Sequence, residues 1–347
     1  MPNPVLTDAI ERLANGEDLS SDEAARVLGE VMEGNASEAQ SAAFLIALRA
    51  KGETVQEVAG LARTMRDLAV PVDAGENLVD TAGTGGGRPT FNVSTTAALV
   101  AAGAGCRVAK HGNRSATSQC GSADVLEALG GRIDLEPEEI ADCVETVGFG
   151  FMFAPLHHRA MRHVVPVRKE LGVRTIFNFL GPLTNPAGAR HQVIGVSDPQ
   201  KLELMGAALG ALGTDRALVV SSADGLDEFS PSGATRVVEL RDGRLATYEV
   251  TPPEAGLEPV PEAAVGAGTP TENAAVVLRV LDGEPGAERS LAVLNGAAAI
   301  YVSGRADSLA EGARRAEESI DSGAARTVLE RWLERTGAAG RSGGGDR

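Results

Sequence analysis

The sequence predicts an α/β protein with a small N-terminal helical domain and a larger α/β domain built on a mostly parallel central sheet. The chain has 347 residues, more than a single hydrophobic core usually serves. Its first part carries only helical patterns, whereas short apolar strands alternate with helical patterns farther along. We therefore expect a helical domain over residues 1–72, joined by helices from about 165–190, an α/β domain over 73–338, and a frayed tail over 339–347.

Three helix starts are marked in the N-terminal part by residues typical of capping boxes. The segments SSDE (20–23), SEAQ (37–40) and TVQE (54–57) each precede a run whose apolar residues follow the helical period. Gly52 stands where a glycine often ends a helix, and the third helix should run to Leu68. These signals predict a helical module.

Strand patterns begin after this module. Short apolar runs end in glycine, serine or other polar residues, and helical patterns separate several of them, which favours a parallel sheet. The predicted strands are NLVDTAG (77–83), CRVAKHG (106–112), HQVIGVS (191–197) and RALVVSS (216–222); the helical patterns are 94–105, 123–131, 138–148 and 201–213. RVVEL (236–240) and ATYEV (246–250) flank Asp242 and Gly243, which predicts an antiparallel hairpin.

Composition narrows the class of protein. The formal net charge is −16 and the sequence contains no basic stripe, so we expect no binding of nucleic acid. The longest nearly apolar stretch, around 97–105, is too short to span a membrane, and the N-terminus does not resemble a signal peptide. Three cysteines without CxxC spacing suggest neither a disulfide framework nor a zinc site. We expect a cytoplasmic protein.

The densest functional signal is the segment DTAGTGGGRPTFNVST, residues 80–95. An apolar strand runs into consecutive glycines, and a helix begins near Ser94. Backbone N–H groups of such a loop, with the helix N-terminus behind them, can bind phosphate oxygens. The alternative is an ordinary flexible turn. The glycine spacing matches neither a dinucleotide-binding fingerprint nor a Walker A loop.

A second polar segment follows the next strand. KHGNRSATS (110–118) and GSAD (121–124) bring a lysine, an arginine, an asparagine and several hydroxyls to a strand end of an otherwise acidic chain. Ligands of parallel α/β sheets bind at this edge, so an anion site is indicated; the alternative is a solvated loop.

Two further clusters contain residue types that bind metals. DGLDE (224–228) follows a predicted strand, and its neighbouring carboxylates suit Mg²⁺ with a diphosphate, although such pairs are also common on surfaces. His157 and His158 have no metal-ligand spacing around them. They are expected either to line a pocket or to be solvated.

Together, these segments resemble the anthranilate phosphoribosyltransferase family along nearly the whole chain. The order and spacing of the motifs match as well as their letters. The matching segments are GTGG (83–86), NVST (92–95), KHGNR (110–114), GSAD (121–124), FAP (153–155), VRKELGVRTIFNFLGPLTNP (167–186) and GLDE (225–228). The resemblance implies transfer of phosphoribosyl from phosphoribosyl diphosphate (PRPP) to the anthranilate amine in tryptophan biosynthesis, with Mg²⁺, on a fold shared with pyrimidine nucleoside phosphorylases.

The resemblance also implies the site residues. PRPP should contact Gly83, Gly86, Gly87, Thr90, Asn92, Val93, Ser94, Thr95, Lys110, His111, Gly112, Asn113, Arg114, Ser115, Ala116, Thr117, Ser118 and Ser122. Anthranilate should meet Gly83, Asn113 and Arg168, with His111, Pro155, His158 and Gly181 lining its path. Mg²⁺ should lie at Ser94, Asp227 and Glu228. The planar fork of Arg168 suits the substrate carboxylate.

One departure from the family pattern affects the glycine loop. The family usually has an aspartate after GTGG, and the simplest alignment deletes it here, leaving Arg88 and Pro89 at the tip of a loop one residue shorter. Arg88 could turn inward toward the diphosphate or outward into solvent. Cys120 also stands where the family often has serine.

The expected mechanism needs no essential acid or base, because the aromatic amine of anthranilate is uncharged at neutral pH. Positioning and stabilisation of the leaving diphosphate should suffice. A nucleoside phosphorylase is the nearest alternative, and a noncatalytic nucleic-acid-binding relative is another. We expect a homodimer formed through the helical domain, whose apolar faces exceed what about 70 residues can bury.

Overall fold

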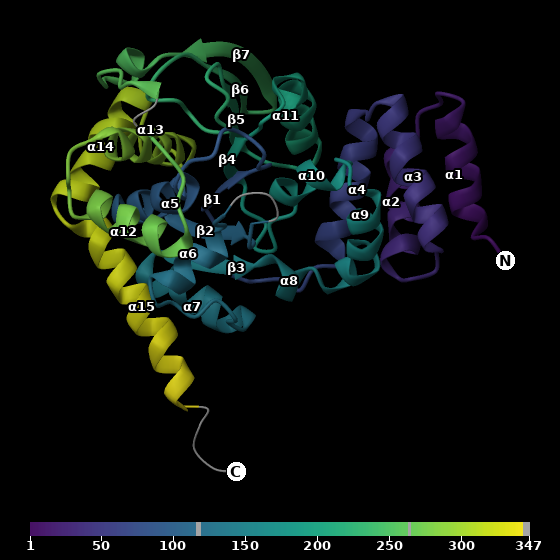
Figure 1. Ribbon diagram of the computed structural model, residues 1–347, viewed down its shortest axis with the longest axis horizontal. Coiled ribbons are helices and arrows are strands. Elements are labelled where there is room, and N and C mark those ends of the chain that lie inside the picture. Colours follow the sequence, from purple (N-terminus) through teal and green to yellow (C-terminus); the bar gives the residue numbers. More distant parts are fainter. Residues whose placement is uncertain (116–118, 263–264, 343–347) are drawn as a thin grey trace.

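The computed structural model describes residues 1–115, 119–262 and 265–342, the last five as backbone only. A bundle of helices stands at one end of the molecule and a sheet flanked by helices forms the rest (Figure 1). The helices are α1 (Pro4–Ala14), α2 (Ser21–Met32), α3 (Glu38–Lys51), α4 (Val55–Asp67), α5 (Val93–Gly103), α6 (Ser122–Ala128), α7 (Pro137–Val147), α8 (Ala154–His157), α9 (Val165–Leu171), α10 (Phe177–Leu180), α11 (Leu202–Ala211), α12 (Pro270–Leu281), α13 (Ala287–Val302), α14 (Leu309–Asp321) and α15 (Ala324–Ser342). The strands are β1 (Leu78–Gly83), β2 (Arg107–Gly112), β3 (Phe149–Phe153), β4 (His191–Gly195), β5 (Arg216–Ser222), β6 (Thr235–Arg241) and β7 (Arg244–Val250).

The predicted helix starts of the N-terminal module are confirmed. At the start of α2 the Ser20 side chain accepts from the Glu23 backbone N–H, and the Glu23 carboxylate accepts in return from the Ser20 backbone N–H. Thr54 and Glu57 form the same arrangement at the start of α4. The start of α3 has half of this arrangement, with the Ser37 side chain accepting from the backbone of residue 40. Helix α1 carries no capping box, and the sequence patterns did not predict it.

The sheet is mostly parallel, as predicted. Among the described residues, seven strands lie in the order β3-β2-β1-β4-β5-β6-β7, and the first five are mutually parallel. β6 pairs antiparallel with β5, and β7 pairs antiparallel with β6, with the predicted turn at Asp242 and Gly243, both at positive φ. The edge strand β3 was not predicted. The pairing register brings the carboxyl ends of β1 to β5 to a single edge, which is where the candidate site lies.

Two apolar cores occupy the two faces of the sheet. One packs α5, α13, α14 and α15 against the strands; the mainly apolar α5 is buried on nearly all sides, and α13 is buried from Leu291 to Val302. The other joins the N-terminal module to α9, α10, α11 and the opposite face of β4, β5 and β6. Much of the module's apolar surface is therefore buried within the chain. This covers part of the excess that led us to expect a dimer.

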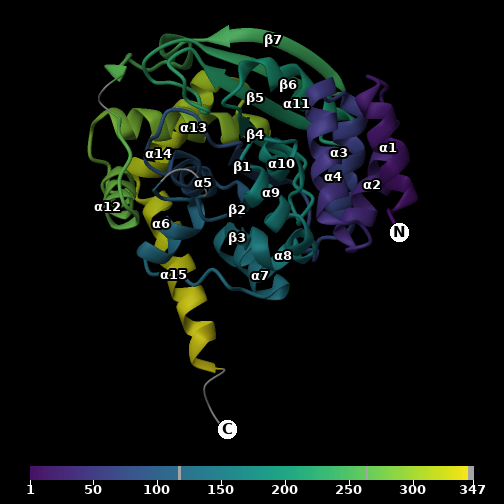
Figure 2. The same cartoon turned by 45° about the vertical axis from the view of Figure 1, so that its right-hand side comes forward.

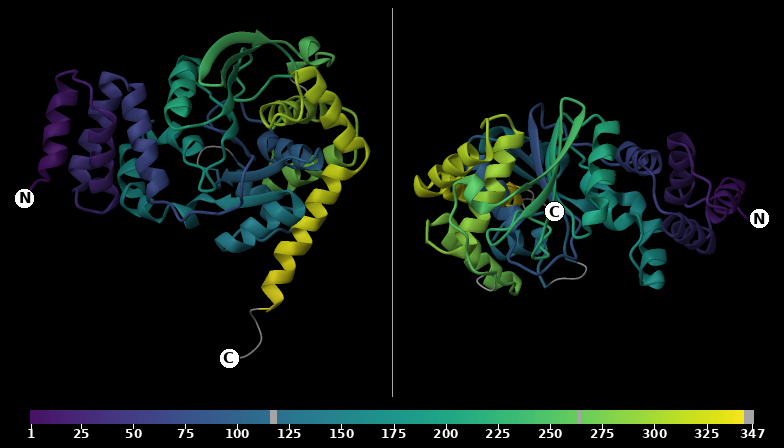
Figure 3. Two further views of the ribbon diagram at one scale, coloured as in Figure 1. Left: turned by 180° about the vertical axis from the view of Figure 1, so that it is seen from behind. Right: turned by 90° about the horizontal axis from the view of Figure 1, so that it is seen from above.

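Helix α15, the last described element, runs away from the N-terminal module. Figures 2 and 3 show α15 running away from the sheet on the side opposite α1. Within the described residues, no helix is long and apolar enough to cross a membrane.

Candidate active site

Three strand-end segments meet at the carboxyl edge of the sheet. We call residues 83–90 the glycine loop, residues 112–121 the basic loop and residues 223–228 the acidic loop. They follow β1, β2 and β5 respectively. Residues 116–118, which include the predicted PRPP contacts Ala116, Thr117 and Ser118, lie outside the described residues.

The glycine loop folds tightly against the acidic loop. The backbone N–H of Gly85 donates to Asp227 Oδ2 at 3.0 Å, and the N–H of Arg88 donates to the Gly225 carbonyl at 2.7 Å. A Cβ on Gly87 would lie 2.6 Å from Asp227 Oδ1, so no larger residue fits there. Gly86 adopts a φ of +86°, which disfavours any side chain. The glycines are thus required by close approach and by backbone conformation.

The predicted residues around the start of α5 lie behind this loop. Ser94 is partly exposed, whereas Val93 and Thr95 are buried, and the buried Thr95 Oγ1 has no hydrogen-bond partner in the described part of the chain. The Asn92 side chain donates to the Cys120 carbonyl at 3.3 Å and accepts from Cys120 Sγ at 3.1 Å. Cys120 therefore links the basic loop to the start of α5 through its carbonyl and its thiol.

Lys110 is a fully buried cation at the centre of the site. Its Nζ donates to the Thr81 carbonyl at 2.5 Å and to Ser94 Oγ at 3.2 Å. Burial lowers the pKa of Lys110, while the charges of Asp80 and Glu228 act to raise it. Its ammonium thus connects the end of β1, the start of α5 and the acidic carboxylates.

The basic loop is organised by Asp124 of the GSAD motif. Asp124 Oδ2 accepts from the backbone N–H groups of Ser115 at 3.2 Å and Gly121 at 2.7 Å. At the start of the loop, a Cβ on Gly112 would lie 3.0 Å from Ser122 Cβ, so these two predicted residues touch. Asn113 is exposed.

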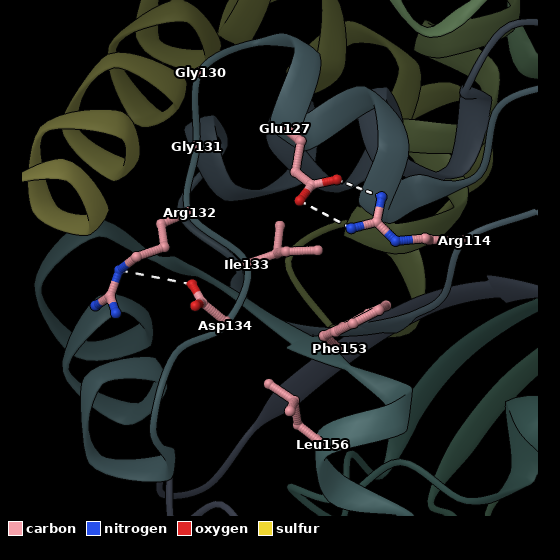
Figure 4. A pocket seen from close by; sticks show the side chains of 9 residues that line it. All are labelled: Arg114, Glu127, Gly130, Gly131, Arg132, Ile133, Asp134, Phe153 and Leu156. Atoms are coloured by element: carbon pink, nitrogen blue, oxygen red, sulfur yellow. Dashed lines mark hydrogen bonds and ion pairs between the residues drawn. The ribbon is translucent and has the colours of Figure 1, made fainter. Parts of the chain in front are cut away.

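Arg114 does not turn toward the glycine loop. Its guanidinium pairs with Asp124 and Glu127 and lies over the Phe153 ring at 5.5 Å. It lines a separate pocket of about 560 Å³, shown in Figure 4. Among the predicted site residues within the described chain, Arg114 alone lines this pocket. An engaged Arg114 is poorly placed to contact PRPP in this conformation.

Two neutral histidines lie beside each other next to the basic loop. The rings of His111 and His158 are 5.1 Å apart, and His158 Nε2 lies 3.1 Å from the Thr184 carbonyl oxygen. Burial lowers the pKa of His158 to about 4 and that of His111 well below its usual value. The backbone of Gly181 hydrogen-bonds His111, so three predicted anthranilate residues gather here. Pro155, on α8, is exposed.

Arg168 stands on α9, one short helix away from Gly181. It is partly buried, and its guanidinium lies 5.6 Å from the centre of the Phe177 ring on α10. Among the described residues, no carboxylate forms an ion pair with it, although removal from water lowers its pKa. A desolvated arginine without an anionic partner is chemically suited to a ligand carboxylate.

The acidic loop contains one carboxylate whose charge is compensated by protein groups, Asp224, and two whose charges are compensated less fully, Asp227 and Glu228. Asp224 accepts from Ser222 Oγ at 2.5 Å and from Ser230 Oγ at 2.8 Å, and these bonds, with Arg88, lower its pKa. Burial raises the pKa of Asp227 and, with the charge of Asp227, raises that of Glu228 well above its usual value. Desolvated neighbouring carboxylates of this kind favour a hard divalent cation. Among the described residues, no group of three or more His, Cys, Asp or Glu side chains is arranged to hold a metal ion, so further oxygen ligands would have to come from elsewhere.

Arg88 takes neither of the two orientations considered from the sequence. Its Nη2 lies 3.0 Å from Asp224 Oδ2 and its Nη1 donates to the Glu262 carbonyl at 2.9 Å. The side chain is therefore neither directed at a diphosphate nor solvated. The acidic loop holds it.

Two polar groups of the site were missed. Arg174 Nη2 donates to the Gly85 carbonyl and to Ser197 Oγ, each at 3.2 Å. Asp80, buried in β1, accepts from the His111 backbone at 3.1 Å and from Asn185 at 2.7 Å. Arg174 and Asn185 both belong to the long 167–186 motif and could have been singled out there. Asp80 is the first residue of the 80–95 segment, but it was not singled out there as a site residue.

Comparison with known proteins agrees with this geometry. The model of the "Glycosyl transferase family, helical bundle domain" matches residues 7–69, and that of the "Glycosyl transferase family, a/b domain" matches residues 75–326. The anthranilate phosphoribosyltransferase of Symbiobacterium thermophilum is 53% identical over 329 residues, 94% of this chain and 96% of that protein. The enzyme of the same name from Rubrobacter xylanophilus is 53% identical over 332 residues, 95% of this chain and 97% of its own.

Solved structures give the same result. The anthranilate phosphoribosyltransferase of Thermus thermophilus superposes with a TM-score of 0.90 at 46% identity, covering 95% of this chain and 99% of that one. The Saccharomyces cerevisiae enzyme, solved in complex with PRPP and Mg, gives 0.87 at 29% identity, covering 96% and 98%. The two family models and the relatives matched over nearly their whole length show that this chain belongs to the glycosyl transferase family, among the anthranilate phosphoribosyltransferases.

Proposed function

We propose that this protein transfers the 5-phosphoribosyl group from PRPP to the amine of anthranilate, giving N-(5-phosphoribosyl)anthranilate and diphosphate in tryptophan biosynthesis. The observation that carries the proposal is the meeting of the glycine loop, Lys110 and the carboxylates of Asp227 and Glu228 at one sheet edge. Relatives sharing about half of their residues over nearly the whole chain bear this name.

PRPP is assigned to the space bordered by the glycine loop, the start of α5 and the basic loop. Backbone N–H groups and the α5 N-terminus would face its diphosphate. Lys110 already bridges β1 and Ser94, so its ammonium is held in place before the ligand arrives. The assigned residues are Gly83, Gly86, Gly87, Thr90, Asn92, Val93, Ser94, Thr95, Lys110, His111, Gly112, Asn113, Ser115 and Ser122, with Arg114 included only if it leaves Glu127 and Asp124.

Mg²⁺ is assigned to Asp227, Glu228 and Ser94. The raised pKa values of both carboxylates fit this assignment, because a divalent cation would offset the cost of burying two neighbouring negative charges. When bound with PRPP, the ion would screen the charge of the departing diphosphate. The relative from yeast was solved with PRPP and Mg.

Anthranilate is assigned to the space near Arg168, Gly181 and the two neutral histidines, reached past Pro155 and bordered by Gly83 and Asn113. Arg168 would pair with its carboxylate. Because His111 and His158 are held neutral, they present an uncharged wall and are poorly suited to serve as general acids at neutral pH. The amine needs no deprotonation before attack, so orientation of the two substrates can supply most of the rate.

We also propose a homodimer formed through the helical module. Helix α3 leaves Ala39, Ala43, Ile46 and Ala50 exposed at helical spacing, and Ile46 is 40% exposed. Helix α3 contacts α9, where the apolar Val165 is 52% exposed. A second copy of the chain would cover this apolar stripe.

The three buried cysteines form no disulfide, which is consistent with a reducing compartment such as the cytoplasm.

Anthranilate fluorescence gives a direct test of the proposed activity. The fluorescence of anthranilate should decrease when the purified protein is mixed with anthranilate, PRPP and Mg²⁺. Omitting PRPP, or removing the metal with a chelator, should stop the loss. A signal that is independent of PRPP would exclude the proposed reaction.

A further inference from the structure

Arg88 and the missing loop aspartate can be understood together. The glycine loop is one residue shorter than the pattern of the resembling family, and it lacks the aspartate that follows GTGG in that pattern. In its place, the loop carries an arginine that reaches the acidic loop. The carboxylates that we assign to the metal, Asp227 and Glu228, follow its partner Asp224 in the same acidic loop.

The two loops are fastened together at three points. Asp227 Oδ2 accepts from the Gly85 N–H, the Gly225 carbonyl accepts from the Arg88 N–H, and Asp224 Oδ2 pairs with Arg88 Nη2 at 3.0 Å. The first contact engages the carboxylate that we assign to the metal. Movement of the glycine loop would therefore move Asp227 or break its hydrogen bond.

The Arg88 pair is better fixed than an ordinary surface ion pair. The Asp224 side chain is 8% exposed and that of Arg88 is 23% exposed. Asp224 is held from its other side by the hydroxyls of Ser222 and Ser230. Arg88 gains a second anchor in the Glu262 carbonyl, 2.9 Å from its Nη1. Both partners are thus held in place before they meet.

We propose that Arg88 is a positioning residue for the divalent cation, and that its pair with Asp224 locks the shortened glycine loop onto the acidic loop so that Asp227 stays aligned with the metal. The inference rests on the proposed function. Arg88 acts through Asp224 and Asp227 and touches no substrate. Its charge also neutralises Asp224, which leaves the cation to Asp227 and Glu228.

Removing Arg88 alone would mix two opposing effects. Loss of a positive charge near the site favours cation binding, whereas loss of the lock disfavours it. The double variant Arg88→Ala/Asp224→Asn keeps the net charge constant and removes the lock. A matched control is Arg289→Ala/Asp321→Asn, because Arg289 also joins an aspartate and a backbone carbonyl, that of Gly283, and neither Arg289 nor Asp321 belongs to the three loops of the site.

Mn²⁺ can replace Mg²⁺ as the probe, and its binding is read by electron paramagnetic resonance in the presence of PRPP. The Arg88/Asp224 double variant should bind Mn²⁺ about fivefold more weakly than the wild type, which corresponds to a loss of roughly 1 kcal/mol in the free energy of binding. The anthranilate KM should stay unchanged, and the metal concentration for half-maximal rate should rise in parallel. The single variant Arg88→Lys should keep most of the wild-type affinity for Mn²⁺, because lysine can still form an ion pair with Asp224.

The possible outcomes separate this inference from the proposed function. Superimposable Mn²⁺ isotherms for wild type and double variant would overturn the positioning role and leave the metal site standing. An equal loss in the control pair, or an equal rise in the anthranilate KM, would also overturn it, since either indicates general loosening. A wild-type protein that binds no Mn²⁺ with PRPP would overturn this inference and the proposed metal site together.

Discussion

Replacing Arg168 by alanine should damage recognition of anthranilate and leave that of PRPP nearly intact. In the structure, its guanidinium lies on the Phe177 ring and has no carboxylate partner among the described residues. It is partly desolvated, which lowers its pKa. A charge-assisted hydrogen bond from such a group contributes roughly 1.5–3 kcal/mol. The anthranilate KM of Arg168→Ala should therefore rise about 10- to 150-fold.

The same position gives a second, opposite effect on stability. An arginine held partly out of water without an anion lowers the stability of the ligand-free protein, so Arg168→Ala should not unfold it. The loss of affinity should thus appear without a loss of fold. Arg168→Lys should recover only part of the affinity, because lysine keeps the charge but lacks the planar fork.

The assay is the initial rate of anthranilate fluorescence loss at varied anthranilate with saturating PRPP, and then the reverse. Lys169→Ala is the matched control, because Lys169 is the exposed neighbour on the same helix α9. An unchanged anthranilate KM in Arg168→Ala would remove Arg168 from the site. An equal rise in both KM values would show that the substitution acts on the fold.

The other predictions concern the metal, pH and assembly. Asp227→Ala/Glu228→Ala should abolish Mg²⁺-dependent turnover without lowering the melting temperature, since burial raises both pKa values and the two charges oppose folding at neutral pH; activity that still responds to Mg²⁺ would place the metal elsewhere. The pKa of His158 is lowered to about 4 in the folded protein, so this group stabilises the fold fully above pH 6.5, and that stabilisation is lost as the pH falls toward 4. The free energy of unfolding, measured with denaturant, should fall by about 2 kcal/mol between pH 7 and pH 5 because of this group, and His158→Gln should remove that part of the fall. The same pH dependence of unfolding in wild type and variant would contradict the lowered pKa of His158. Ile46→Glu should dissociate the proposed dimer, because it places a charge in the exposed stripe of α3; light scattering that shows a monomeric wild type would count against the interface.

Local signals along the chain predicted most of the fold. Capping residues such as Ser20 and Thr54 satisfy N–H groups at helix starts, so their effect can be read without knowing the tertiary structure. The hairpin followed from Asp242 and Gly243, which tolerate the positive φ of the turn. Strand β3 was missed because the short run FGFMF contains Gly150, and a glycine inside an apolar run weakens a strand pattern, although Gly148 marks the end of the helix before it.

The candidate site was predictable in its motifs and not in its contacts. The strand-end positions of Lys110 and Asp227 indicated where ligands would bind, because parallel strands end at one edge. The partner of Arg88 could not be inferred, since Asp224 lies 136 residues farther along and only the fold brings it near. Arg114 shows the reverse case: its place in a phosphate motif predicted a ligand contact, whereas local carboxylates on α6 engage it.

Phosphorus NMR of the complete reaction tests the central claim most directly. With Mg²⁺, PRPP and anthranilate, the account predicts that the PRPP signals disappear at the rate at which diphosphate and one new phosphoribosyl signal appear, in equal amounts. Without anthranilate, PRPP should persist. Breakdown of PRPP that does not depend on anthranilate, or no breakdown in the complete mixture, would contradict the proposed transfer.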